Sequence, residues 1–516
     1  MNIAVLTKDK PKKRHKVWPI LGISLLVFLL FLSFCAFFSA KWYIRTYGQM
    51  GFDAVLYTLL GGLGGLEPAL LRSYLLSGLL PAVACTAGML LILFFPWKKQ
   101  LSLNVSKIHL PLFPVHPIFA TVVCIAILPF LLEQAAVDVE LAAYVKSVSQ
   151  MSTIYQNEYK DPDTVQITFP EEKRNLIYIF LESMETTFFS QEQGGILDTN
   201  VIPELYALAE ENINFSQNDS VGGYFSMTGA GWTVGSMVSH TAGIPLKTPP
   251  NVDGNDYGGD GNFLNGVTTI TDILHENGYY QALMVGSDAT FGGRKQYYTQ
   301  HNVDRVYELT SFWEDGIVEN GRSVWWGVED MYLFEYAKQA LTEMAAGDQP
   351  FAFTMLTVDT HHIGGYVCPL CGNDREEQYE NVLACSSRQV AGFVQWLQAQ
   401  PFYENTTVII VGDHPSMDGE YIKRHAPEDY KRMVYNCILN SAVQTDNTKN
   451  RRFCALDMLP TTLAAMGCTI EGDRLGLGTN LFSDQQTLVE SIGRWNFNQE
   501  LSKNSHYYTS EFFFDN

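Results

Sequence analysis

Four positions in this chain of 516 residues carry side chains whose types suit metal-assisted chemistry. Glu182, Asp413 and His414 supply two carboxylates and an imidazole. This set suits a hard or borderline divalent cation such as Mn²⁺, Mg²⁺ or Zn²⁺. Thr233 supplies a hydroxyl, which is too weakly acidic to attack unaided but becomes a nucleophile when it coordinates such a cation. Together the four residues predict a metal centre with its own nucleophile.

Thr233 lies in a glycine-rich segment, residues 229–236, that precedes an apolar stretch with helical character. The pattern places Thr233 at the N-terminus of a helix, where backbone N–H groups and the helix dipole attract an anion. The simpler alternative is that Thr233 only caps this helix.

Four apolar runs in the C-terminal two thirds of the chain have the length and composition of strands buried on both faces. They are residues 175–181, 281–285, 351–358 and 407–411. Because helical stretches separate them, we expect an α/β domain with a doubly wound sheet. In such a sheet, ligands bind at the carboxyl ends of the strands.

Polar residues follow each of these four runs directly. Glu182 follows the first, Asp288 the second, Thr360, His361 and His362 come shortly after the third, and Asp413 with His414 follows the fourth. Any one acidic residue in such a place is commonly a helix cap or part of a solvated turn. The coincidence of four strands is what indicates a functional site.

Three uncharged apolar stretches near the N-terminus are long enough to cross a bilayer, at about 20 residues per crossing. They are residues 18–40, 75–95 and 111–132, the last two interrupted by prolines. A cleavable signal peptide is the alternative for the first, but its apolar core would be shorter, at about 7 to 15 residues. Residues 54–66 are apolar but short and rich in glycine, so we expect a re-entrant or interfacial piece there.

Basic residues precede the first stretch and follow the second, which predicts a cytoplasmic N-terminus and, after three crossings, an extracytoplasmic C-terminal part. We therefore expect a multi-pass protein of the cell membrane. Its divisions are residues 1–133 as the transmembrane domain, 134–172 as a linker helix region, and 173–516 as the catalytic domain. The net charge of −21 makes nucleic acid a poor partner.

Nine cysteines occur in the chain, three of them in the apolar stretches and six in the C-terminal part. Cys368 and Cys371 resemble half of a zinc ribbon, but no second pair with matching spacing follows. We expect a loop disulfide that involves Cys385, since an extracytoplasmic domain permits one.

Several longer motifs carry a resemblance to a known family. NLIYIFLES, GWTVGSMVS, VDTHH and VGDHPSM occur in that order, followed by DMLPTTLAAMG and EGDRLGLGTNLF. This series resembles the lipoteichoic acid synthases and membrane phosphoglycerol transferases, which are sulfatase-like members of the alkaline phosphatase superfamily. The resemblance covers most of the chain and implies an alkaline-phosphatase/sulfatase-like fold.

Carried over by motif, the resemblance implies that Glu182, Thr233, Asp413 and His414 bind the metal, with Mn²⁺ expected first. It implies that Thr233 forms a covalent glycerophospho-threonine intermediate and that His361 assists proton transfer.

The resemblance also implies residues that bind the substrate. Arg294 would clamp a phosphate oxygen, and Asp288, His361 and His362 would lie in the same pocket, with His361 favoured over His362 for the direct contact.

The implied reaction moves glycerol phosphate from phosphatidylglycerol to a membrane glycolipid or glycan acceptor. Membrane anchorage suits it, because a tethered domain meets a lipid headgroup at high effective concentration.

Some features leave the acceptor open. Gly286 and Gly292 stand where the teichoic-acid synthase pattern has a histidine and a tryptophan. A phosphoethanolamine transferase is the main alternative, and a sulfatase-like hydrolase is weaker because the Cys/Ser-x-Pro-x-Arg motif is absent. Outside enzymes, the alternative is an inactive lipid- or glycan-binding sensor, against which the intact set of four residues argues.

Overall fold

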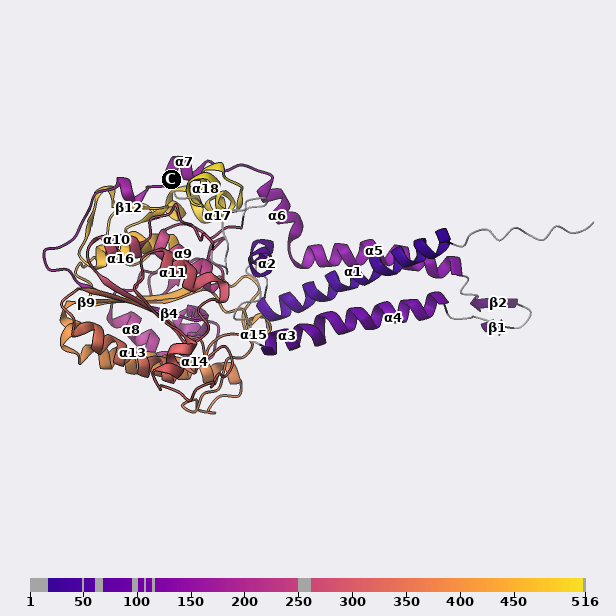
Figure 1. Cartoon of the computed structure of the whole chain (residues 1–516), viewed down its shortest axis with the longest axis horizontal. Helices are drawn as coiled ribbons and strands as arrows, with labels where there is room; N and C mark the ends of the chain where they lie inside the picture. Colours follow the sequence, from indigo (N-terminus) through magenta and orange to yellow (C-terminus); the bar gives the residue numbers. More distant parts are fainter. Residues whose placement is uncertain are drawn as a thin grey trace, which may run out of the picture. The chain divides into compact units, whose positions relative to one another are not determined.

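The chain was analysed as a computed structural model that describes residues 17–48, 51–60, 68–94, 101–105, 108–113, 117–248 and 261–513. Its internal contacts divide it into two compact units. The first consists of Met1–Tyr43 and Ala69–Asp138, and the second of Ile44–Pro68 and Val139–Asn516. The first unit is helical and the second is the α/β domain (Figure 1).

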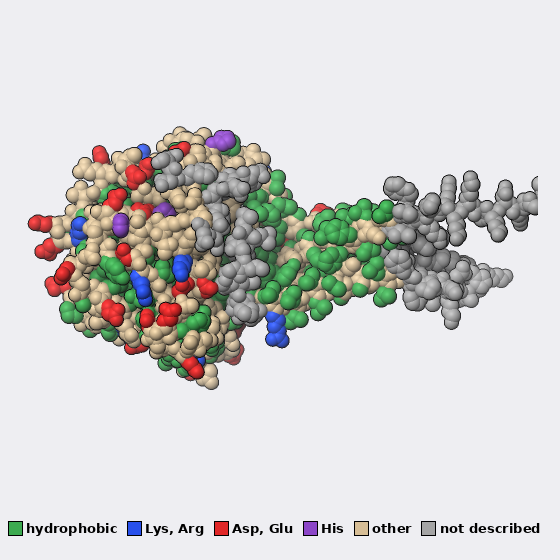
Figure 2. Space-filling model, viewed as in Figure 1, with side chains coloured by type: hydrophobic (Ala, Val, Ile, Leu, Met, Phe, Trp, Pro, Cys, Tyr) green, Lys and Arg blue, Asp and Glu red, His purple; other side chains and the backbone are tan. Residues whose placement is uncertain are grey.

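Three helices of the described residues are long and apolar enough to cross a membrane: Leu21–Tyr47, Leu70–Ile92 and Thr121–Asp138. They belong to α1 (Val17–Tyr47), to the continuous run of α3 (Pro68–Tyr74), a π-helical turn and α4 (Leu80–Phe94), and to α5 (Pro117–Asp138). Many of their large apolar side chains are exposed, as the space-filling view shows (Figure 2). Exposed apolar surface of this kind is typical of lipid-facing helices.

The third apolar helix begins later than the sequence predicts. Residues 111–113 belong to β2 (Ile108–Phe113), which pairs with β1 (Leu101–Val105), and α5 starts only at Pro117. The physical reason is the run of prolines at 111, 114 and 117, because proline is tolerated in a helix only in its first turn. The predicted span at 111–132 is therefore displaced toward the C-terminus.

The short apolar stretch after α1 forms α2 (Gly51–Leu60), and residues 61–67 lie outside the described part. Ala54 and Tyr57 of this helix are buried in the core of the second unit, and α2 contacts α6 (Leu141–Val148). Core packing within the α/β unit thus explains its apolar residues, where a re-entrant or interfacial membrane piece was expected.

Residues 134–172, which the sequence predicts to be a linker helix region, form several short elements. After α5 come α6, α7 (Ile154–Glu158) and β3 (Ile167–Thr168), which pairs with β11 (Thr469–Ile470). Tyr155 of α7 is 1% exposed and packs edge-on against Tyr508 and Phe512. The segment is therefore folded onto the α/β unit, because its aromatic side chains complete that unit's core.

The central sheet has seven strands in the order β5-β10-β9-β4-β8-β6-β7. The strands β9 (Thr406–Gly412), β4 (Asn175–Leu181), β8 (Phe351–Leu356), β6 (Tyr280–Val285) and β7 (Arg305–Tyr307) are parallel, and β10 (Val434–Leu439) runs antiparallel to its two neighbours, β9 and β5 (Gly223–Tyr224). The four predicted strands are confirmed, and the sheet is doubly wound with a mixed edge.

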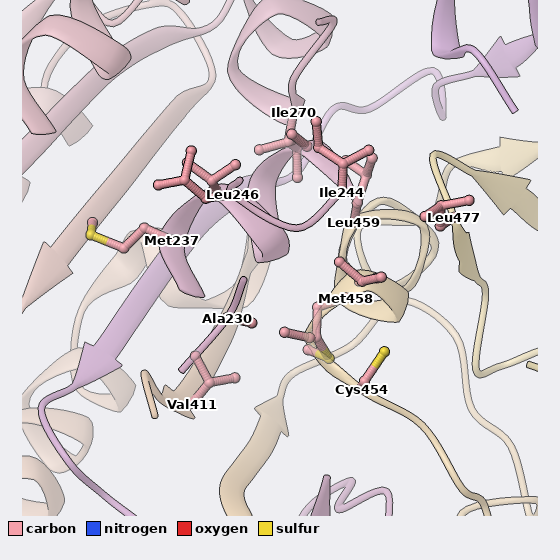
Figure 3. Close-up of a cluster of buried hydrophobic side chains, with 14 of the residues drawn as sticks. Ala230, Met237, Ile244, Leu246, Ile270, Val411, Cys454, Met458, Leu459 and Leu477 are labelled. Carbon is pink, nitrogen blue, oxygen red and sulfur yellow. The ribbon is translucent and has the colours of Figure 1, made fainter. Parts of the chain in front are cut away.

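Helices cover both faces of this sheet (Figure 1). One face carries α9 (Thr233–Ala242), α10 (Ile270–Glu276), α11 (Arg294–Gln300) and α16 (Met458–Ala465); the other carries α8 (Pro203–Glu211), α13 (Asp330–Ala345) and α14 (Gln378–Gln398). Alternate strand residues point to the two faces, so Tyr178 and Phe180 join one core and Ile177 and Ile179 the other. Figure 3 shows part of the first core, to which α9 contributes Met237 and α16 contributes Met458 and Leu459.

The remaining elements surround the sheet at its ends. They are α12 (Leu309–Glu314), α15 (Gly419–His425), α17 (Arg494–Ser502), α18 (His506–Glu511), β12 (Arg474–Leu475) and β13 (Gly478–Thr479). Three cysteines, Cys368, Cys371 and Cys385, lie close together, but all nine cysteines are free, so the expected loop disulfide is not formed.

Replacing Phe353 by alanine tests this core. Phe353 is fully buried in the middle of β8, and a large-to-small change there leaves a cavity, so we expect a loss of about 3–5 kcal/mol in the free energy of unfolding. Its neighbour Thr354 is only half-buried, and Thr354→Ala should cost much less. Chemical denaturation of the full-length protein in detergent measures both; equal losses would contradict the two-faced core.

Candidate active site

Glu182 lies directly after β4 and is 2% exposed. The Ser183 hydroxyl donates to its Oε1 at 2.6 Å, and its backbone N–H donates to Thr357 Oγ1 at 3.0 Å. Thr360 Oγ1 donates to its carbonyl oxygen at 2.6 Å. Three hydroxyl side chains, two of them from the segment after β8, therefore fix this carboxylate and its backbone at the end of the sheet.

Asp413 lies directly after β9 and is 1% exposed. Its Oδ1 accepts N–H groups from Ser183 at 2.8 Å and from His414 at 2.7 Å. Its Oδ2 is buried and accepts no hydrogen bond from any residue that the structure describes. Burial, with the nearby charge of Glu182 as the second cause, raises the pKa of Asp413 to about 7. The site therefore resists a second negative charge unless a cation compensates it.

His414 is fully buried beside these carboxylates. Its Nδ1 lies 3.0 Å from the carbonyl oxygen of Pro415, so Nδ1–H is the donor and Nε2 is the ring nitrogen that faces the acidic group. Nε2 is 3.3 Å from Asp413 Oδ2 and 3.7 Å from Glu182 Oε1. Burial lowers the pKa of His414, but the charges of Asp413 and Glu182 outweigh burial and leave the pKa raised.

Thr233 is the first residue of α9, as the glycine-rich pattern predicts. Its Oγ1 lies 3.4 Å from Glu182 Oε2 and 3.3 Å from His414 Nε2. Its side chain makes no capping bond to the backbone of its own helix: the hydroxyl is directed at the acidic group. The structure thus brings together all four residues predicted for the metal centre.

These side chains fit a divalent cation. Ligand atoms of Glu182, Asp413 and His414 all lie within 4.8 Å of one another in a buried position. Asp413 Oδ2 has no hydrogen-bond partner among the described residues, and His414 Nε2 faces Thr233 Oγ1 at 3.3 Å, so a cation there could be bound by both atoms. Two carboxylates and an imidazole suit Mn²⁺, Mg²⁺ or Zn²⁺.

His361 and His362 lie on the loop after β8. His361 Nδ1 is 2.8 Å from the carbonyl oxygen of His362, so Nδ1–H donates and Nε2 is the free nitrogen. The His361 ring lies between Trp326, at a centroid distance of 4.6 Å, and His362, at 4.3 Å. Burial is the main cause that lowers the pKa of His361 to about 4, and the charges of His414 and, to a smaller extent, Arg294 add to the lowering. His361 is therefore a neutral imidazole.

The surroundings of His362 differ from those of His361. It is 4% exposed, its Nδ1 has no hydrogen-bond partner, and its ring contacts Tyr47 edge-on at 5.4 Å. Burial lowers its pKa well below the ordinary value. Its surroundings are those of a packed side chain.

Arg294 and Asp288 are close in space, but their polar groups have different partners. Arg294 is 6% exposed, and Nη2 donates to Ser287 Oγ and to the carbonyl oxygen of Asp288. Its Nη1 makes no hydrogen bond within the described chain and stays available for an anion. The Asp288 carboxylate instead closes a turn by accepting both the N–H and the hydroxyl of Thr290.

Sequence reasoning missed several neighbours of the site. Trp326, to which no role was assigned, covers His361 and also contacts Phe291. Asp330 accepts the backbone N–H groups of Val358 and Asp359, at 2.7 and 3.1 Å, and so holds the start of the histidine loop. The sequence signal for Trp326 and Asp330 was the segment WWGVED, but its aromatic and acidic residues have no periodic pattern from which a role could be predicted.

A doubly wound sheet with carboxylates, an imidazole and a hydroxyl gathered at the ends of its strands defines an alkaline-phosphatase-like α/β domain. The family model described as Sulfatase matches residues 174–515. The chain therefore belongs to the sulfatase family.

Curated relatives are phosphoglycerol transferases, which confirms the resemblance seen in the motifs. Phosphoglycerol transferase I of Xanthomonas campestris is 30% identical over 256 residues, 48% of this chain and 35% of that protein. Phosphoglycerol transferase I of Escherichia fergusonii is 28% identical over 337 residues, 63% and 41%. The matched regions thus span well under half the length of these relatives. The lipoteichoic acid synthase LtaP of Listeria monocytogenes gives a TM-score of 0.49 at 18% identity, over 62% of this chain and 79% of that chain.

Metal binding is the first test of the site. Asp413→Asn should abolish tight binding of Mn²⁺, because it removes a charged ligand. Ser183→Ala should weaken binding by about tenfold to a hundredfold, since Ser183 orients Glu182. Asp288→Asn, whose carboxylate is engaged with Thr290, is the matched control and should bind as wild type. Calorimetric titration decides; unchanged affinity in Asp413→Asn would rule this centre out.

Proposed function

We propose that this protein is a metal-dependent transferase that moves glycerol phosphate from phosphatidylglycerol to a membrane glycolipid or glycan acceptor through a covalent intermediate on Thr233. The observation that carries the proposal is the position of the Thr233 hydroxyl, within 3.4 Å of Glu182 and His414 at the start of α9. The kinship with phosphoglycerol transferases supports the choice of donor and transferred group.

Glu182, Thr233, Asp413 and His414 would hold the divalent ion, for which we propose Mn²⁺, with Mg²⁺ or Zn²⁺ as alternatives. Bound there, it would supply Lewis acidity that lowers the pKa of the threonine hydroxyl and neutralises phosphate charge. The N-terminus of α9 adds partial positive charge on the same side of the phosphate.

In the first half of the reaction, Thr233 Oγ1 forms a bond to the phosphorus of phosphatidylglycerol. The bond from phosphorus to the diacylglycerol oxygen breaks, and diacylglycerol leaves. The proton that Thr233 loses is balanced by the one that the diacylglycerol oxygen gains. Arg294 can hold a phosphate oxygen through its free Nη1 during this step.

In the second half, an acceptor hydroxyl attacks the same phosphorus and the bond to Thr233 breaks. The neutral His361 has its Nδ1–H engaged by the carbonyl of His362, so Nε2 can take the acceptor's proton. Thr233 regains a proton and the enzyme returns to its starting state. We propose that His362 packs and orients this ring and that Asp288 shapes the turn that presents Arg294.

The reaction requires that lipid and active site meet at a membrane. We propose a transmembrane domain over residues 1–133 with three crossings, the third of which continues to Asp138, then a connecting segment up to residue 172 and an extracytoplasmic catalytic domain from residue 173. The apolar helices Leu21–Tyr47, Leu70–Ile92 and Thr121–Asp138 support anchorage. The cationic N-terminal residues support a cytoplasmic start.

The nearest alternative is transfer of phosphoethanolamine, which requires the same nucleophile and metal. The choice between the donors depends on the headgroup pocket, where Arg294 and the turn at Asp288 lie.

Intact-mass measurement tests donor and nucleophile together. After incubation of the full-length protein with Mn²⁺ and phosphatidylglycerol vesicles, we expect a glycerophosphate adduct that Thr233→Ala lacks. Phosphatidylethanolamine vesicles run in parallel should give none. A phosphoethanolamine adduct would favour the alternative, and no adduct with either lipid would contradict a covalent transferase.

The two histidines give a second test. His361→Gln should form the Thr233 adduct normally but release further diacylglycerol about 100-fold more slowly, because the base of the second half is lost. His362→Gln should change turnover much less. Time courses of diacylglycerol release from phosphatidylglycerol vesicles, read beside the adduct mass, separate the halves. Equal loss in both variants, or no adduct in His361→Gln, would remove the assigned role.

A further inference from the structure

A second cluster of metal-ligating side chains lies on the loop that follows β8. Cys368 Sγ is 3.7 Å from Cys371 Sγ and 3.7 Å from Cys385 Sγ, and all three sulfur atoms lie within 4.8 Å of one another. Cys368 and Cys385 are each 2% exposed, and Cys371 is half-buried. None of them belongs to the active site described above.

Local geometry aims the sulfur atoms at one point. The N–H of Cys371 donates to the carbonyl oxygen of Cys368 at 3.0 Å, so residues 368–371 form a tight turn that turns both thiols the same way. Cys385 approaches from the first half of α14. One turn and one helix thus supply three thiols, one fewer than the four protein ligands of a closed structural zinc site.

The sulfur spacing distinguishes a metal from a disulfide. In a tetrahedral zinc site with Zn–S bonds of about 2.3 Å, two sulfur atoms are about 3.8 Å apart, close to both distances from Cys368. Because Cys368 is equally far from Cys371 and Cys385, no pair is singled out for a bond. A disulfide would also leave the third thiol without a role.

The side chains around the cluster suit bound thiolates. The Gln389 side-chain amide donates to Cys385 Sγ at 3.4 Å, a contact that stabilises a thiolate. The same amide lies 3.9 Å from Cys368 Sγ. Three thiolates this close together would need a cation to compensate their charge.

Hydrogen bonds hold the first half of this loop, but its distal half has little support from apolar burial. Residues 357–377 contain no helix or strand, and an irregular stretch of this length is uncommon in a compact domain. Its large apolar side chains Ile363, Val367 and Leu370 are 51%, 48% and 53% exposed, so apolar burial holds it weakly. The thiol cluster is the buried part of its distal half.

We propose that Cys368, Cys371 and Cys385 bind one zinc ion, with a water molecule as fourth ligand, and that this ion fastens the loop carrying His361 to α14. The half-buried Cys371 leaves one side of the cluster open to that water. The site is structural, and it is independent of the metal centre at Glu182.

Metal analysis of the full-length protein in detergent tests this site. Cys371→Ser, the least buried of the three, should lose about one zinc per chain relative to wild type, and Cys368→Ser/Cys385→Ser should lose the same. Cys468→Ser, a buried cysteine outside the cluster, should lose none. Asp413→Asn should keep this zinc, which separates the cluster from the active site. Unchanged zinc in the cluster variants would overturn the proposal.

Cobalt substitution identifies the ligands. Co²⁺ bound to thiolates gives a sulfur-to-metal charge-transfer band in the near ultraviolet, which the oxygen and nitrogen ligands at Glu182, Asp413 and His414 cannot give. We expect the band in wild type and in Asp413→Asn and its loss in Cys371→Ser. Absence of the band in wild type, or an intact mass lighter by two hydrogen atoms with Cys368 disulfide-bonded, would overturn the proposal.

Limited trypsin digestion reads out the loop, because Arg375 lies in its last part. Cleavage after Arg375 should be faster in Cys371→Ser and in chelator-treated wild type than in Cys468→Ser. Equal cleavage rates would show that the cluster does not fasten the loop.

Discussion

The structure of this domain depends on the electrostatic repulsion between two buried carboxylates. Glu182 and Asp413 are 2% and 1% exposed, and each stands at the end of a central strand. Placing two like charges together away from water is costly unless hydrogen bonds and a cation compensate them. The surrounding hydroxyl and N–H groups supply the hydrogen bonds, and a divalent cation held by Glu182, Asp413 and His414 would supply the positive charge. The geometry at the sheet edge is arranged around that requirement.

The same requirement explains why the loop after β8 is tied at several points. Thr357 and Thr360 bind the backbone N–H and carbonyl groups of Glu182. Asp330 accepts the N–H groups of Val358 and Asp359. Tyr379 of α14 donates to the carbonyl oxygen of Thr360. His361 thereby keeps its position relative to the acidic group without belonging to a regular element. A side chain that handles protons needs such support, because its usefulness depends on distance.

Much of the sheet could be predicted from the sequence, because strands buried on both faces appear as continuous apolar runs, as in Asn175–Leu181. The four metal-centre residues followed from the ends of two such strands and one glycine-rich turn. Trp326 beside His361 could not be predicted, since long-range packing has no local pattern. The turn formed by Asp288 was missed because a carboxylate that binds its own loop looks the same in sequence as one that binds a ligand. The late start of α5 was missed because it depends on the prolines before this helix. The folding of residues 139–172 onto the α/β unit was missed because it depends on aromatic contacts with the distant C-terminus.

The α/β unit is joined to the apolar helices at more than one point along the chain. The α/β unit is made from two separate pieces of chain, because Ile44–Pro68 belongs to it although Ala69–Asp138 belongs to the helical unit. Tyr57 of α2 packs against Trp232 and donates a hydrogen bond to the carbonyl of Gly292, beside Thr233 and Arg294. A single peptide cut after Asp138 would therefore not liberate the domain whole. α2 would stay covalently joined to the apolar helices. The released domain would then lack Tyr57 and its contacts with Trp232 and Gly292 next to the active site.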